Sequence, residues 1–105
     1  MAKLPVQLFD RPTPYRVRVD KRAGVELEAL PFAVSSVAVA ILETFAWSGA
    51  VLIEGKAGGI KALRGRLEGF YRIRFLDSWR IVLKVSRPAR TIHVIRVRDR
   101  ASAYQ

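Results

Sequence analysis

Apolar and polar residues alternate with a period of two over residues 15–19 and 70–76, and this pattern predicts β-strands. Two further strands are predicted at residues 79–85, between two turns, and at residues 91–97, which are rich in β-branched residues. In the first segment we expect Tyr15, Val17 and Val19 to face the core. The last three segments follow one another closely, so turns at Asp77–Ser78 and Ser86–Arg90 should make them an antiparallel meander. The predicted strands cover residues 15–19, 70–76, 79–85 and 91–97.

Between the first strand and the meander, the pattern favours two helices. Asp20 suits the N-cap of a short helix that runs to about Leu30, and Pro31 suits the first turn of the next helix. That second helix, Phe32–Trp47, is apolar almost all round, so we expect burial on more than one side, with Trp47 in the core. The predicted fold class is therefore α+β: an N-terminal strand, a helical hairpin and a three-stranded antiparallel meander.

The remaining segments suggest one domain with a short lead-in. Residues 1–14 hold three prolines and no periodic pattern, so we expect the domain to span residues 15–105. Residues 54–69 are rich in Gly and Lys and should form a loop or a weak strand. This segment lacks the Gly-Lys-Ser/Thr ending of a P-loop, so it predicts no cradle for nucleotide phosphates.

Charge is concentrated in the second half of the chain. Of the 105 residues, 19 are Lys or Arg and 9 are Asp or Glu, which gives a net charge of +10. Residues 1–55 hold six basic and six acidic side chains, whereas residues 56–105 hold thirteen and three, so the second half carries the whole excess. Fourteen of the cations are Arg, which contacts phosphates through two parallel hydrogen bonds. The imbalance predicts a polyanionic partner, nucleic acid before an anionic membrane.

Several classes of site and segment are excluded by composition. The chain has no Cys, which excludes disulfides, thiolate metal sites and a thiol nucleophile. Its one histidine, His93, should be packed or lie at a sheet edge, and we expect no metal and no cofactor. No signal peptide is visible, so we expect a cytoplasmic protein. Residues 29–53 carry one charge, Glu43, but Pro31 and several polar residues argue for a buried helix and against a membrane span.

The second half of the chain also carries four motifs in a characteristic order. They are Lys61-Ala62-Leu63-Arg64-Gly65, Gly69-Phe70-Tyr71-Arg72-Ile73-Arg74, Trp79-Arg80-Ile81-Val82 and Ile95-Arg96-Val97-Arg98-Asp99-Arg100, followed by Tyr104. Their order and spacing resemble the RelE/ParE superfamily of bacterial toxins, over about residues 15–104. The resemblance implies a small antiparallel sheet with a helical hairpin packed on one face.

The resemblance also implies a function. RelE-type members cut mRNA in the ribosomal A site and are neutralised by a cognate antitoxin that wraps them, whereas ParE-type members poison DNA gyrase. We expect a RelE-like, ribosome-dependent mRNA endonuclease that inhibits translation, with an antitoxin, the ribosome and mRNA as partners. Two alternatives stay open: a ParE-like gyrase inhibitor without nuclease activity, and a degenerate toxin that binds only its antitoxin and DNA operator.

Five residues take catalytic roles by this resemblance. Arg72 and Arg74 match a basic pair that binds phosphate and handles protons, although RelE itself has lysines there. Arg80 matches the arginine that stabilises the transition state, and Arg100 the one that stabilises the leaving group. Tyr104 matches a tyrosine that stacks on or orients a base.

The residues themselves are compatible with RNA cleavage. Arg72 and Arg74 alternate on one strand, and Arg80 begins the next strand, so their guanidiniums should converge on one sheet face. Such a cluster binds phosphate and stabilises a pentacoordinate transition state, while the RNA's own 2′-hydroxyl is the nucleophile. A guanidinium is a poor general base, so Glu68 or Asp99 is the candidate for that role.

Further cations are candidates for contacts with the RNA backbone. The predicted RNA-binding residues are Lys56, Lys61, Arg64, Arg66, Arg96 and Arg98. Because several cations would displace counterions, RNA binding should depend strongly on salt. The simpler interpretation is that Arg72 and Arg74 form the solvated face of a half-buried strand, and that Arg80 pairs with Asp77 or Asp99 on the surface. Trp79 can serve core packing or base stacking.

Overall fold

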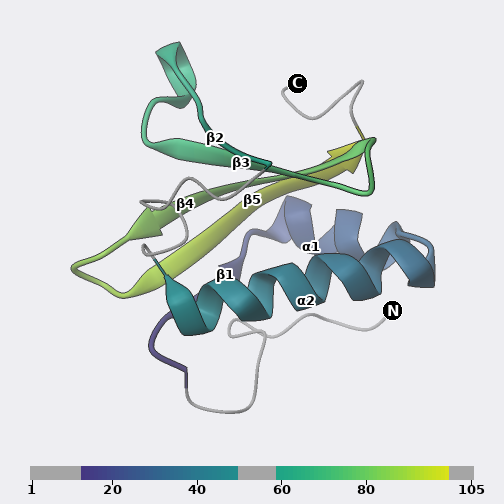
Figure 1. Cartoon of the computed structure of the whole chain (residues 1–105), viewed down its shortest axis with the longest axis horizontal. Coiled ribbons are helices and arrows are strands. Elements are labelled where there is room, and N and C mark those ends of the chain that lie inside the picture. Colours follow the sequence, from purple (N-terminus) through teal and green to yellow (C-terminus); the bar gives the residue numbers. More distant parts are fainter. Residues whose placement is uncertain (1–12, 50–58, 100–105) are drawn as a thin grey trace.

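The described residues, 13–49 and 59–99 of the computed structural model, form a five-stranded sheet with two α-helices on one of its faces (Figure 1). The predicted α+β class is confirmed. In chain order the elements are β1 (Arg16–Val19), α1 (Lys21–Ala29), α2 (Phe32–Ser48), β2 (Ile60–Ala62), the short 3₁₀ helix η1 (Gly65–Leu67), β3 (Phe70–Phe75), β4 (Trp79–Ser86) and β5 (Thr91–Asp99).

The strand order across the sheet is β1-β5-β4-β3-β2. Strands β3, β4 and β5 form the predicted antiparallel meander, and β2 adds a short antiparallel strand within the segment predicted as a loop or weak strand. The sheet is mixed, whereas the resemblance implied an antiparallel one, because β1, whose pairing the sequence left open, pairs with β5 in parallel. The chain leaves β1 through both helices and enters the sheet again at the opposite edge. Three reversals from β2 onwards then bring β5 alongside β1 in the same direction.

The core lies between the helices and the sheet face that they cover. Val17, Ile81 and Leu83 are buried on the sheet side, and they pack in one cluster with Leu42 and Phe45 of α2. Tyr15 and Val19 pack against the same cluster, so the inward face predicted for the first strand is confirmed. Trp79 also packs against this cluster, which favours core packing over base stacking for its side chain.

The burial predicted for α2 is wrong on one side of the helix. Trp47, expected in the core, is 50% exposed, and Phe32 at the other end of the helix is 84% exposed. Ser36, Ala40 and Thr44 continue this exposed stripe between them. The apolar composition misled the prediction because α2 covers only one face of a single sheet, and no other described element lies over its outer side. Among the described residues, no helix is long and apolar enough to cross a membrane.

Gly49 is the C-cap of α2, and its backbone conformation makes it hard to replace. Its φ of 56° lies in the left-handed region, and a Cβ atom there would stand 2.2 Å from Cε1 of Tyr15. We expect Gly49→Ala to lower the free energy of unfolding by about 2 kcal/mol or more, because strain and overlap add. Thermal unfolding measures this. Gly65→Ala is the control: its φ is 67°, but a Cβ meets nothing within 4 Å, so an equally large loss there would contradict the steric argument.

Candidate nucleic-acid interface

Three arginines stand side by side across the sheet face that is turned away from the helices. In the ladder Arg74 of β3 is paired with Arg80 of β4, and Arg80 with Arg98 of β5. Directly paired residues in an antiparallel sheet point to the same face, with Cβ atoms about 4.5–5.5 Å apart. We call this set the arginine row. The structure thus brings Arg74 and Arg80 together as the sequence predicted, and adds Arg98 from the RNA-binding set.

We call the sheet face that is turned away from the helices the open face. Two more rows of paired residues, most of them basic, run parallel to the arginine row on it. The second row holds Lys61, Arg72, Val82 and Arg96, and the third holds Phe70, Lys84, His93 and Arg18. Among the described residues, the ladder positions of the open face carry no carboxylate. The alternative of a merely solvated strand face for Arg72 and Arg74 leaves unexplained why cations from all five strands gather on it.

A β-bulge in β5 is what places its arginines on the open face. Val82 pairs with Arg96 and the next residue, Leu83, pairs with Val94, so Ile95 is an extra residue in the strand. Strand side chains alternate between faces, so without the extra residue the buried Val94 would put Arg96 on the core side. The bulge resets the alternation: Val97 is buried at 1% exposure, while its arginine neighbours turn outward.

Arg80 is buried at the centre of the arginine row. It is 5% exposed, and its Nη1 donates to the backbone carbonyls of Asp77 (3.3 Å) and Trp79 (3.1 Å). The surface ion pair with Asp77 or Asp99 that the simpler interpretation gave Arg80 is not made, because the acceptors are neutral backbone carbonyls. Both bonds use Nη1, so Nε and Nη2 donate to no other described residue. A guanidinium fixed in this way has donors left for an anion.

The arginines of neighbouring strands repel one another across the open face. Charges about 5 Å apart repel by roughly 3 kcal/mol at an effective dielectric constant of about 20, and an anion between them reverses the sign of that energy. In the second row the Nε of Arg72 is buried and donates to no acceptor. A buried donor without a partner costs about 1–3 kcal/mol. A phosphate on this face would relieve the repulsion among the arginines.

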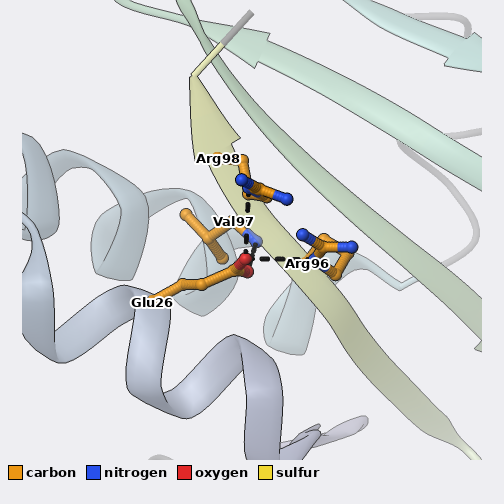
Figure 2. A network of polar contacts seen from close by, with 4 residues as sticks. All are labelled: Glu26, Arg96, Val97 and Arg98. Atoms are coloured by element: carbon orange, nitrogen blue, oxygen red, sulfur yellow. Dashed lines mark hydrogen bonds and ion pairs between the residues drawn. The ribbon is translucent and has the colours of Figure 1, made fainter. Parts of the chain in front are cut away.

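Glu26 of α1 neutralises part of this charge at the edge of the sheet (Figure 2). Its Oε2 lies 3.0 Å from Nε of Arg96 and 3.4 Å from Nε of Arg98, and its Oε1 accepts the backbone N–H of Val97 at 2.7 Å. The Glu26 side chain is 18% exposed, so these contacts are partly shielded from water. The Glu26 carboxylate therefore links α1 to Arg96 and Arg98 of β5.

We expect Glu26→Gln to lower the free energy of unfolding by about 2–3 kcal/mol, because the two arginines lose their shared charge partner while partly buried. For a domain of this size that shifts the melting temperature by roughly 10 °C or more. Differential scanning calorimetry gives the value. Glu28→Gln, an exposed change on the same helix, serves as the control; equal losses in the two variants would show that the Glu26 contacts contribute nothing special.

Several predicted site residues lie away from the arginine row or outside the described residues. Lys56, Arg100 and Tyr104 lie outside the described residues. Arg64 and Arg66 are exposed at η1, in the connection between β2 and β3. Glu68 follows η1 and, with Arg64, lines a hollow of about 400 Å³ there. Asp99 pairs with Trp79 in the ladder, which puts it on the helix-side face. Neither candidate base therefore stands in the arginine row.

Other residues of the open face were not predicted for the site. Lys84 and Phe70 alternate with Arg80 and with Arg72, so the period-two pattern held enough information to find them. The position of Arg18 on the open face could not be predicted without knowing that β1 pairs with β5 in parallel. Glu26 is 70 residues from Arg96 in sequence, and no local pattern connects them. His93 is exposed on the open face of a central strand, so the expected packed or edge position is wrong; its Nε2 lies 3.9 Å from Oδ1 of Asp20.

No group of three or more metal-ligating side chains occurs among residues 13–49 and 59–99.

No protein-family model matches the sequence, and no curated protein matches it. Solved structures do match. A chain of the RelBE2 toxin–antitoxin complex from Mycobacterium tuberculosis superposes with a TM-score of 0.61 at 26% identity, covering 83% of this chain and 99% of the other.

A chain of the archaeal RelE–RelB complex from Pyrococcus horikoshii gives a TM-score of 0.67 at 22% identity, with 86% and 99% of the two chains covered. The chain has the RelE/ParE toxin fold. The YoeB/ParE toxin from Agrobacterium tumefaciens gives 0.64 at 16% identity, with 79% and 95% covered. These matches confirm the resemblance found in the sequence motifs.

Proposed function

We propose that the protein is a RelE-like toxin that cuts mRNA on the ribosome and so inhibits translation. The single observation that carries the proposal is the arginine row, with Arg80 buried between Arg74 and Arg98. The RelE/ParE fold supports it, since structures with this fold include chains of complexes named for RelE. Arginine donors fixed on a sheet face suit the phosphodiester of a single strand.

The chemistry needs neither a protein nucleophile nor a metal ion. The 2′-hydroxyl of the RNA attacks the adjacent phosphorus and gives up its proton, and the bond to the 5′-oxygen breaks. The 5′-oxygen takes up a proton, and the other product ends in a 2′,3′-cyclic phosphate. Arg80 and its neighbours stabilise the extra negative charge of the pentacoordinate transition state. Arg72 and Arg74 bind the phosphate, Arg100 acts on the leaving group and Tyr104 stacks on a base. Neither carboxylate candidate stands in the arginine row, so in this proposal the proton of the 2′-hydroxyl passes to a base from the ribosome or the solvent, and ribosome binding positions the RNA for attack.

The partner proposed for the resting state is a cognate antitoxin. Two of the matched chains come from complexes described as toxin–antitoxin or RelE–RelB assemblies. An antitoxin that supplies carboxylates to the open face would neutralise the cations of the three rows, much as Glu26 neutralises Arg96 and Arg98. The same contact would exclude RNA from the arginine row.

Inducing the chain in bacteria without an antitoxin tests the proposal. We expect growth arrest, with transcript 5′ ends mapped at codon-spaced positions inside reading frames, and loss of both effects in Arg80→Ala. Intact transcripts with gyrase-linked DNA damage and altered plasmid supercoiling would support gyrase inhibition instead. The absence of any growth defect would indicate a toxin that binds only its antitoxin.

A further inference from the structure

The third row of the open face contains an aromatic ring beside basic side chains, whereas the arginine row contains only arginines. Nζ of Lys84 lies 5.6 Å from the centre of the Phe70 ring, a cation–π pair, and Lys84 is exposed. His93 and Arg18 continue the row across β5 and β1, and both are exposed. An aromatic ring beside exposed cations is the combination that binds single-stranded nucleic acids, because the ring stacks on a base while the cations contact the backbone.

A hollow adjoins this row at the end of β4. It has a volume of about 490 Å³ and is lined by Tyr71, Lys84, Ser86 and Arg87 among others. Pockets for small molecules fall in a range of about 300–1,000 Å³, so the hollow has room for a nucleotide. Its lining includes the hydroxyl of Ser86 and the cationic side chains of Lys84 and Arg87, which suit a ribose and a phosphate. Tyr71 lies on the helix side of the sheet and packs against the core, so the ring beside Lys84 on the open face is Phe70.

The third row lies at a fixed distance from the arginine row. Arg80 and Lys84 are four residues apart on β4, which is about 13 Å at a rise of about 3.3 Å per residue. Their side chains point to the same face, with the second row between them. A strand bound at Arg80 can therefore continue along β4, past Val82 and its ladder partner Arg72, to Lys84.

We propose that Phe70, Lys84 and the adjoining hollow form a second subsite, which holds a nucleotide of single-stranded RNA away from the cleaved bond. This inference rests on the proposed function, since the arginine row is taken to hold the phosphate that reacts. The subsite sets the direction of the RNA along β4. It also makes affinity depend on RNA length, because a dinucleotide at the arginine row does not reach Lys84.

Binding of 2′-O-methylated RNA, which cannot be cut, tests the subsite without requiring activity. We expect Lys84→Ala to weaken binding of a longer oligonucleotide about tenfold and to reduce the slope of log affinity against log salt by about 1, because one phosphate contact is lost. Phe70→Leu should weaken binding of the same RNA by a similar factor. The slope of log affinity against log salt should stay unchanged, because stacking displaces no counterions. Neither variant should alter binding of a dinucleotide.

Two comparisons complete the test. Lys21→Ala removes the same charge from the exposed surface of α1 and should leave RNA affinity unchanged. Arg80→Ala should weaken binding of both the dinucleotide and the longer RNA. If both RNAs depend on Arg80 but neither depends on Lys84 or Phe70, the second subsite is wrong and the proposed function stands. If the longer RNA depends on Lys84 while mRNA on ribosomes stays intact, the subsite stands and the nuclease function fails.

Discussion

Replacing Arg80 with Ala should reduce mRNA cleavage on ribosomes by about a hundredfold to a thousandfold, which is the usual effect of removing one fixed donor to a transition-state oxyanion. Arg80 is the central member of the arginine row, and its Nη1 bonds to two carbonyls fix the guanidinium. Single-turnover cleavage on mRNA-programmed ribosomes measures the effect. Because the substrate is held mainly by other contacts, the loss should fall on the cleavage rate more than on binding.

The control for this prediction is Arg80→Lys, which keeps the charge but lacks the planar fork. It should recover part of the rate and leave the fold intact. Thermal unfolding of both variants separates catalysis from folding, since Arg80 is buried and its loss also removes two hydrogen bonds. A correctly folded Arg80→Ala protein that cuts at the wild-type rate would remove Arg80 from the mechanism.

Exchanging two neighbours on β5, as the double variant Arg96→Val/Val97→Arg, should destabilise the protein by about 3–5 kcal/mol although its composition is unchanged. Val97 is 1% exposed in the core, so the swap buries an arginine there without a charge partner. If the variant lost the bulge at Ile95, the introduced arginine at position 97 would face outward. The same change would turn Arg98 towards the core, so the variant would not be rescued. In either register one arginine is buried.

Circular dichroism during heating measures this loss. A total stability of about 5–15 kcal/mol is normal for a domain, so the swapped variant should melt far below the wild type or fail to fold. Ile95→Ala keeps the length and the alternation of β5 and should cost much less. A swapped variant that melts near the wild-type temperature would mean that the bulge does not control which face the β5 arginines occupy.

Much of this fold could be predicted from the sequence, because local patterns determine it. Period-two alternation located β1 and β3, and it placed Arg72 and Arg74 on one face together, whereas turn signals and β-branched residues located β4 and β5. The parallel pairing of β1 with β5 could not be predicted in this way, since it depends on how the helical hairpin carries the chain across the sheet. Hydrophobic composition misplaced Trp47, because an apolar helix beside a single sheet is covered on one side only.

The candidate site was predicted less completely, for a related reason. Arg80 and Arg98 meet across the ladder only because the bulge at Ile95 corrects the alternation of β5, and a bulge has no reliable local signature. Glu26 reaches the β5 arginines from a different element, so its role needs the tertiary structure. Lys84 and Phe70 lie at even spacings from Arg80 and Arg72 along their strands, so the sequence pattern already places them on the same face.

The central claim is that the open face stabilises attack by the RNA's own 2′-hydroxyl, and one measurement tests it most directly. Ribosomes are programmed with mRNA that carries a single 2′-deoxy nucleotide on the 5′ side of the cut in the A-site codon, beside an all-ribose mRNA. The account predicts cleavage of the all-ribose mRNA to a 2′,3′-cyclic phosphate and no cleavage at the deoxy position. Cleavage of both at similar rates would contradict the account, because the nucleophile would then come from elsewhere.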